Sequence, residues 1–132
     1  MILDTIDPTG ESIKALATEY PKDTPVTMLN ILKFKKKADG KDETGMQAYK
    51  RYSANAVKHL EKADGKLIFA GEVKNTVIGD MEDQPHQILL IEYPSVNHFL
   101  NMVMTPEYQA ISKDRTIALE YGGLIACKKM SK

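Results

Sequence analysis

The stretch VTMLNILKF, residues 26–34, decides the fold because both of its faces are apolar. Pro25 bounds it on one side and a charged run on the other, which favours a strand over a helix. Alternate positions carry Val26, Met28, Leu32 and Phe34 on one face, and Leu29 and Ile31 on the other. The stretch QILLIEY, residues 87–93, is apolar on both faces in the same way. A sheet with one face in water alternates apolar and polar residues, so something must cover both faces of this one.

Start and stop signals place the remaining elements. After the first strand we expect a helix over 44–63, a strand over 66–78, a strand over 86–93, a short helix over 96–104, a helix from 105 to the glycines at 122 and 123, and a strand over 124–130. Thr44, Ser95 and Thr105 are the expected helix caps, and Gly71 marks a possible bulge. The two consecutive strands imply an antiparallel hairpin. The inner stripe of the first helix is expected to hold Met46, Tyr49, Ser53, Ala56, Val57 and Leu60.

The order strand, helix, strand, strand, helix, strand is the split βαβ pattern of a ferredoxin-like domain, an α+β fold with a four-stranded antiparallel sheet. Residues 1–24 are expected to form an N-terminal helical extension, and residues 25–132 a single domain. Helices cover one face of such a sheet, and no further element is long enough to cover the other. Monomers rarely expose apolar patches larger than a few hundred Å². We therefore predict a two-fold homodimer whose sheets pack face to face.

The composition excludes several classes of partner. The 18 basic and 18 acidic side chains cancel, so no positive footprint for nucleic acid is expected. One cysteine excludes an internal disulfide, and no Cys or His spacing predicts a metal site. No window approaches the roughly 18 apolar residues that a membrane span needs, and the N-terminus lacks the features of a signal peptide. A cytoplasmic location is expected.

Three stretches carry a resemblance to a known family: VTMLNILKF, AYKRYSANAVKHLEKADGKLIFAGEV and ILLIEYPSVNHFLNMVMTPEYQAISKDR. Together, over roughly residues 25–130, they resemble the domain of unknown function 1330 family of the dimeric α/β-barrel superfamily. The resemblance implies a ferredoxin-like protomer, a homodimer whose two sheets form a barrel, and a small pocket between sheet and helices. It implies no particular reaction.

The same superfamily includes haem-degrading monooxygenases, which use an Asn on the first strand and a Trp and a His in the second helix region. By similarity of register, Asn30 corresponds to that Asn. The Trp and His positions fall on Met102 and Ser112, so the proximal haem ligand is missing, although His98 lies one helical turn away. The resemblance therefore disfavours haem, and no cofactor is expected.

Arg115 is the first candidate site residue, because helical spacing places it on the apolar stripe of Tyr108 and Ile111. A guanidinium does not lose its proton on burial, so it needs an anion. One reading is an ion pair with Glu92 or Glu107. The other is that the guanidinium holds the carboxylate or enolate oxygen of a small substrate. Both can hold at once.

Further polar and aromatic side chains could complete a site. Asn30 interrupts an apolar strand, and its amide needs a neighbouring side chain, a buried water or a ligand. Tyr49 turns its phenol inward, either as a core aromatic or as a donor to a ligand. His98 is a candidate general base or a surface residue, whereas His59 is expected to be solvated. Arg115, Asn30, Tyr49 and His98 are thus the catalytic candidates, and Tyr52, Glu92, Tyr108 and Met102 the substrate-binding ones.

The leading hypothesis is a homodimeric, cofactor-free enzyme that acts on a small organic acid or an enolisable carbonyl compound. In it Arg115 and Asn30 hold the oxyanion, and a Tyr or His relays a proton. The alternative is a non-catalytic dimer that binds a small molecule or is purely structural. A haem-binding protein is the third reading.

Overall fold

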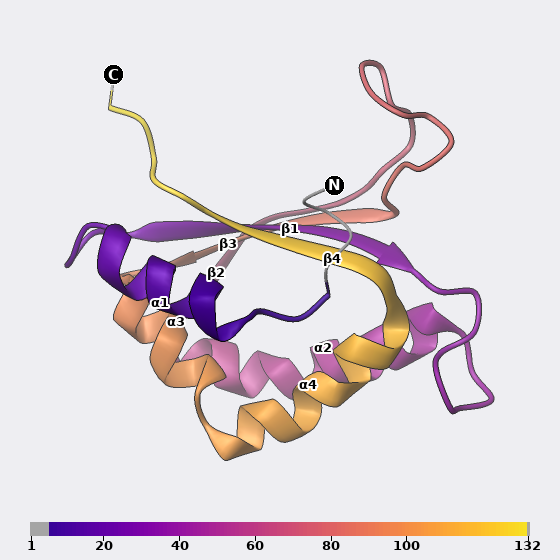
Figure 1. Cartoon of the computed structure of the whole chain (residues 1–132), viewed down its shortest axis with the longest axis horizontal. Coiled ribbons are helices and arrows are strands. Elements are labelled where there is room, and N and C mark those ends of the chain that lie inside the picture. The colour runs from indigo at the N-terminus through magenta and orange to yellow at the C-terminus, as the bar shows by residue number, and fades with distance from the viewer. Residues whose placement is uncertain (1–5, 132) are drawn as a thin grey trace.

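The sheet separates the molecule into a helical layer and a bare side (Figure 1). The computed structural model describes residues 6–131, and within them the chain forms four helices and one four-stranded antiparallel sheet. The elements are α1 (Gly10–Glu19), β1 (Val26–Phe34), α2 (Gly45–Lys62), β2 (Lys66–Glu72), β3 (Gln87–Tyr93), α3 (Val96–Val103), α4 (Pro106–Ala118) and β4 (Leu119–Cys127). The strand order is β2-β3-β1-β4. The predicted ferredoxin-like α+β fold is confirmed. Residues 1–5 of the expected extension lie outside the described part.

The helices begin where their cap residues predict. The side-chain oxygens of Thr9, Thr44, Ser95 and Thr105 each accept the backbone N–H three residues further on. Each such cap stabilises a helix by about 1 kcal/mol. Within residues 6–131, no helix combines the length and the apolar character that a membrane crossing requires.

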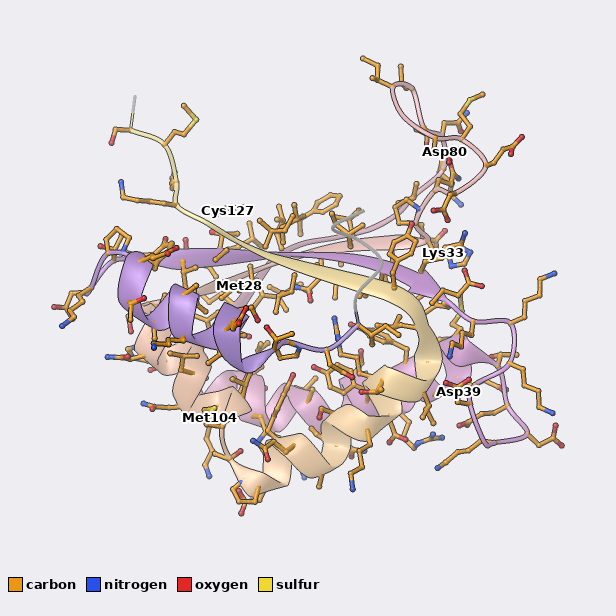
Figure 2. The ribbon with its side chains drawn as sticks, in the orientation of Figure 1. Met28, Lys33, Asp39, Asp80, Met104 and Cys127 are labelled. Atoms are coloured by element: carbon orange, nitrogen blue, oxygen red, sulfur yellow. The ribbon has the colours of Figure 1, made fainter. Side chains whose placement is uncertain are left out.

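β1 lies at the centre of the sheet, and the parity of its residues decides what they contact. Residues opposite each other on antiparallel strands point to the same face. Met28 pairs with Ile91 of β3 and Ala126 of β4, and all three pack in the helix-facing core. Leu29 pairs with Leu90 and Ile125, so these point to the other face. Figure 2 shows Met28 directed towards the helices.

The helix-facing core consists of two apolar clusters at opposite ends of the sheet. The first cluster comprises Val26, Met28, Ala63, Tyr93, Val96, Phe99 and Met102. The second comprises Leu32, Phe34, Ala38, Ala48, Tyr49, Ala118 and Leu119. Leu16 of α1 and Tyr20, the C-cap residue that follows it, pack against the first cluster, which fixes the N-terminal helix to the domain.

The expected boundaries at α4 and β4 are wrong. The helix ends at Ala118 and β4 begins at once with Leu119, so Gly122 and Gly123 lie within the strand. Gly122 is opposite Leu32 on the helix-facing side. A Cβ at Gly122 would lie 2.8 Å from Arg115 Nη2 and 2.7 Å from Leu119 Cδ1. The glycine therefore permits a close approach and does not terminate the helix.

Two details of the hairpin also differ from the expectation. The β2 strand ends at Glu72, and the residues that follow leave the sheet and rise on its bare side (Figure 1). The register shift lies between Leu67 and Phe69, so the bulge is at Ile68 and not at Gly71. The Phe69 ring lies over Gly71, 2.7 Å from where a Cβ would stand. The glycine leaves room for that ring.

The predicted inner stripe of α2 is offset. Met46 and Val57 are exposed, whereas Gly45, Ala48 and Tyr49 are buried. The small residues at 45 and 48 let the start of α2 approach the chain closely: a Cβ at Gly45 would lie 2.3 Å from the Lys35 carbonyl oxygen and 2.4 Å from that of Ala118. Close packing at these small residues sets the rotation of α2 about its axis. A prediction from hydrophobic periodicity does not include such packing.

The outer face of the sheet is apolar, and no helix or strand of residues 6–131 covers it (Figure 1). By register its apolar side chains are Leu29, Ile31, Phe69, Ile88, Leu90 and Ile125. Cys127 also points to this side and is exposed. Both faces of the sheet are thus apolar, as the strand sequences predict.

Candidate functional site

Asn30 is a polar residue on β1 at the division between the two apolar clusters. It lies on β1 between Met28 and Leu32, which are 2% and 0% exposed, yet Asn30 itself is only half-buried. Its Nδ2 donates to the Met28 carbonyl at a long 3.5 Å, and no partner of Oδ1 is described within residues 6–131. The amide is therefore open to a further partner on the helix-facing side of the sheet.

Two tyrosines from the helices connect the two apolar clusters. The hydroxyls of Tyr52, from α2, and Tyr108, from α4, form a hydrogen bond with each other. Tyr52 packs against the second cluster and Tyr108 against the first, so their bond spans the division between the clusters. The Tyr49 and Tyr52 ring centroids are 5.4 Å apart, which places Tyr49 next in the same row.

Tyr93 contributes a fourth phenol from the end of β3. It is 3% exposed, and no hydrogen bond to its hydroxyl is described in the part of the chain that the structure covers. Every fully buried polar side-chain atom of that part has a partner. The Tyr93 hydroxyl therefore reaches space that solvent can enter. We use the name polar seam for Asn30, Tyr52, Tyr93, Tyr108 and Arg115.

Burial keeps these phenols protonated. Desolvation is the main cause that raises the pKa of Tyr49, Tyr93 and Tyr108. The neighbouring Tyr52 raises all three further, whereas the positive charge of Arg115 partly opposes the rise at Tyr49 and Tyr108. At neutral pH the phenols are hydrogen-bond donors and not bases.

Arg115 is half-buried on α4, as its position on the inner stripe predicts. It donates through Nη1 to the Ile6 carbonyl and through Nη2 to the Gly122 carbonyl at 3.0 Å. Within residues 6–131 it forms no ion pair with a carboxylate. Two neutral carbonyls accept from two of its five donors, and neither supplies an opposite charge. That charge acts on Tyr49 and Tyr108.

Three other predicted site residues do not join this group. Glu92 is opposite Thr27 and Lys66 in the sheet, which places it on the outer face, away from Arg115. Met102 is buried in the first cluster. His98 is next to Ser95, with Nδ1 2.7 Å from the serine Oγ, and its Nε2 is 3.8 Å from Asp64. His98 therefore stabilises the start of α3.

His59 was expected to be solvated, whereas the structure places its ring against Tyr108. It is half-buried, and its ring meets the Tyr108 ring edge to face with centroids 5.9 Å apart. The signal was present, because His59 follows Tyr52 by seven residues and so lies on the same helical stripe. It is the histidine in contact with the seam.

Two surface hollows lie elsewhere. One, of about 380 Å³, is lined by Lys36, Lys37, Asp42, Glu43, Thr44 and Gln47 beside the start of α2. The other, of about 350 Å³, lies between α1 and β4 and includes Leu16, Tyr20 and Ala126. Neither includes Asn30, Tyr49 or Arg115, so the pocket between sheet and helices stays a prediction. The described residues contain no cluster of His, Cys, Asp or Glu placed to hold a metal ion.

Solved structures with this fold include enzymes and proteins of unknown function. A hydroxynitrile lyase from Passiflora edulis is 14% identical, with a TM-score of 0.60 over 83% of this chain and 97% of that one. A dimeric protein of unknown function and ferredoxin-like fold from Bacteroides fragilis is 14% identical, with a TM-score of 0.55 over 83% and 100%. At this identity the likeness shows the fold alone.

A nearer relative shares almost the whole chain. A protein of unknown function from Rhodopseudomonas palustris is 30% identical, and its structure matches 97% of this chain and 98% of its own length with a TM-score of 0.90. No curated protein matches the chain. The family model of the domain of unknown function DUF1330 matches residues 41–127. The chain thus belongs to the DUF1330 family.

Proposed function

We propose that this protein is a homodimer that binds the oxygen atoms of a small organic acid or an enolisable carbonyl compound at the polar seam, without a cofactor. The observation that carries the proposal is Asn30, a half-open amide between two closed apolar clusters. Every fully buried polar side-chain atom of the described residues has a partner, so the Asn30 Oδ1, for which none is described, reaches space that a ligand or water can enter.

The groups of the polar seam suit an oxyanion. The Asn30 amide, the protonated phenols and the charged guanidinium are all donors, and they are supplied by two strands and two helices that are already packed. Preorganised donors of this kind stabilise the negative charge that develops when a carbonyl compound enolises. The oxygen of the substrate would then accept hydrogen bonds from Asn30 and from a seam phenol.

Enolisation also requires a proton acceptor. His59 lies against Tyr108, whereas the His98 ring is hydrogen-bonded to Ser95, so we assign the base to His59 rather than to His98. The hydrogen-bonded pair of Tyr52 and Tyr108 would connect this base to the ligand. The hydroxynitrile lyase that shares the fold is an enzyme, which is compatible with such chemistry. A shared fold does not identify the reaction.

A non-catalytic dimer is the second candidate. The two carbonyl contacts of Arg115 favour it, because they join the segment before α1 to β4 without any ligand. In this reading the seam binds a small molecule or water and performs no chemistry.

The apolar outer face of the sheet supports a homodimer. Its apolar side chains have no cover within the described residues, and a second copy of the sheet supplies one of the same size and character. The dimeric ferredoxin-like protein from Bacteroides fragilis supports this arrangement by analogy.

Ligand-dependent thermal stabilisation tests the site. Carboxylates, lactones and phenolic compounds are screened against the wild type, Asn30→Leu, Arg115→Leu and the control Asn55→Ala, which changes an exposed asparagine of α2. We expect a shift that Asn30→Leu and Arg115→Leu abolish and the control retains. A shift that survives both seam substitutions would contradict the proposed site.

Proton exchange separates the two candidates. The stabilising ligand is incubated in D₂O, and NMR follows deuterium at the carbon next to its carbonyl. Exchange that requires His59, tested with His59→Gln, is expected of the enzyme. Binding without protein-dependent exchange supports the non-catalytic dimer.

A further inference from the structure

The segment between β2 and β3 is an arm that rises on the bare side of the sheet. We call residues 74–84 the arm. Figure 1 shows it leaving the sheet on the side opposite the helices, and Figure 2 shows Asp80 in this segment, above the end of the sheet where Lys33 lies. Because the arm extends away from its own core, the packing of its protomer does not account for its shape.

The root of the arm is firmly attached. The Val73 N–H donates to the His86 carbonyl at 2.9 Å, which closes the two legs at the sheet. Lys33 Nζ is 2.6 Å from Asp83 Oδ1, and the Tyr121 hydroxyl donates to the Asp83 carbonyl at 3.2 Å. Lys33 and Tyr121 are opposite each other on the outer face. The arm is thus anchored to that face and directed away from it.

The tip of the arm is apolar and bare. Val77, Ile78 and Met81 are 91%, 95% and 72% exposed. Above the root, a hydrogen bond from Thr76 to Gln84 at 2.8 Å holds the legs together, and the Glu82 N–H donates to Asp80 Oδ1 at 3.0 Å within the tip. Exposed loop tips usually carry small or polar residues. A braced loop that presents Val and Ile is instead typical of a contact surface.

We propose that the arm clasps a second copy of this chain, with Val77 and Ile78 packed on the partner. The inference rests on the proposed pairing of the outer faces and adds a contact to it. The arm starts at the outer face and rises on the same side, so a second sheet laid on that face would lie beside it. The apolar tip would then face the side of that second sheet, beyond the polar contacts of the root.

Two-fold symmetry doubles the effect of each substitution. In a symmetric dimer both arms make the same contact, so a change at the tip removes two contacts at once. The chain also offers a control for substitutions at the tip of the arm. Met46 and Val57 are exposed apolar side chains on the helical side, where no partner is expected.

Sedimentation equilibrium over a range of protein concentrations tests the arm. The double substitution Val77→Ser and Ile78→Ser is compared with the wild type and with Met46→Ser and Val57→Ser combined. We expect the tip variant to raise the dimer dissociation constant at least tenfold and the control to leave it unchanged. Circular dichroism checks that both variants keep the fold, which is expected because neither site is buried.

The outcomes separate the arm from the dimer. A dimeric tip variant with the wild-type dissociation constant overturns the clasp and leaves the pairing of sheets intact. A wild type that is monomeric at high concentration overturns both. A photo-crosslinking amino acid at position 78 provides a second measurement: a covalent dimer linked to the partner's outer face or its rim supports the clasp. A monomeric wild type that binds lipid vesicles through its tip would assign the arm to a membrane instead.

Discussion

The helix-covered face and the outer face of the sheet are built from the same strands, yet the chain completes only one of them. On the covered face, alternate residues of β1 enter two closed clusters, and one polar residue, Asn30, lies between them. On the outer face, the intervening residues Leu29 and Ile31 have only apolar neighbours from β3 and β4. A strand that is apolar on both sides needs a packing partner on each side. In this fold the helices are the partner on one side only.

The largest expected effect comes from placing the same charge on each face in turn. Leu32→Asp buries a carboxylate in the second cluster and should cost about 4 kcal/mol or more, enough to unfold many domains. Leu90→Asp, on the outer face, should keep the fold and weaken the dimer about 100-fold or more, because the charge meets the partner sheet. Urea unfolding and sedimentation measure the two effects. Equal loss of folding in both variants would show that the faces are equivalent.

The next largest effect is expected at the contact between Arg115 and β4. Gly122→Ala introduces a Cβ at 2.8 Å from Arg115 Nη2, so strand and guanidinium must separate. We expect a loss of about 2 kcal/mol and a fall in Tm of several degrees. Gly10→Ala is the control, because nothing lies within 4 Å of a Cβ there. A Tm unaffected by Gly122→Ala would mean that the Arg115 contact contributes little.

A smaller effect is expected at the bond across the polar seam. Tyr52→Phe removes one hydroxyl of the pair with Tyr108 and should destabilise the fold by about 1 kcal/mol. The combined variant with Tyr108→Phe should cost less than the sum of the single changes, since the bond can be lost only once. Additive losses in urea unfolding would show that the two hydroxyls do not interact.

The smallest effect concerns the loss of stability in acid on the helical side of the molecule. Arg51 of α2 holds Glu43 and Asp114 by hydrogen bonds, and this lowers the pKa of both carboxyls below their usual 4.5 and 3.8. A carboxyl with a lowered pKa stabilises the fold above its unfolded pKa, and that stability is lost as the pH falls through the lowered value. Arg51→Met should therefore flatten the fall in Tm between about pH 5 and pH 2.

The exposed pair of Lys74 and Glu72 is the control for this acid response. Both side chains are far more exposed than Glu43 and Asp114, so solvent screens their interaction. Lys74→Met should leave the acid response unchanged. An acid response that Arg51→Met also leaves unchanged would show that other carboxyls dominate it.

Sequence reasoning worked where the controlling interaction is local. Thr44, Ser95 and Thr105 cap helices through bonds to residues three positions ahead, and the alternation in β1 follows from the geometry of a single strand. It failed at β2 and β4, where the boundary depends on what lies across the sheet. Gly122 and Gly123 indicated a helix stop, but pairing with Leu32 and Ile31 keeps them in a strand.

The candidate site divides in the same way. Arg115, Asn30, Tyr49, Tyr52 and Tyr108 were predicted from stripes and parity, and the structure brings them to one side of the sheet. Glu92 was predicted with them, although register on β3 places it on the outer face with Thr27. His59 was expected to be solvated, although it lies on the helical stripe of Tyr52, because the inner stripe of the helix was placed on Tyr49, Ser53 and Leu60.

The sequence by itself determined the alternation of the strands, the helix starts, the order of the elements and hence the ferredoxin-like fold, because each depends on residues a few positions apart. Only the tertiary structure decided which polar groups meet. Tyr52 and Tyr108 are 56 residues apart and bond because α2 packs on α4. Arg115 reaches the carbonyls of Ile6 and Gly122 because the chain before α1 and the start of β4 converge there. Contacts between distant segments depend on the packing of whole elements, which no local spacing specifies.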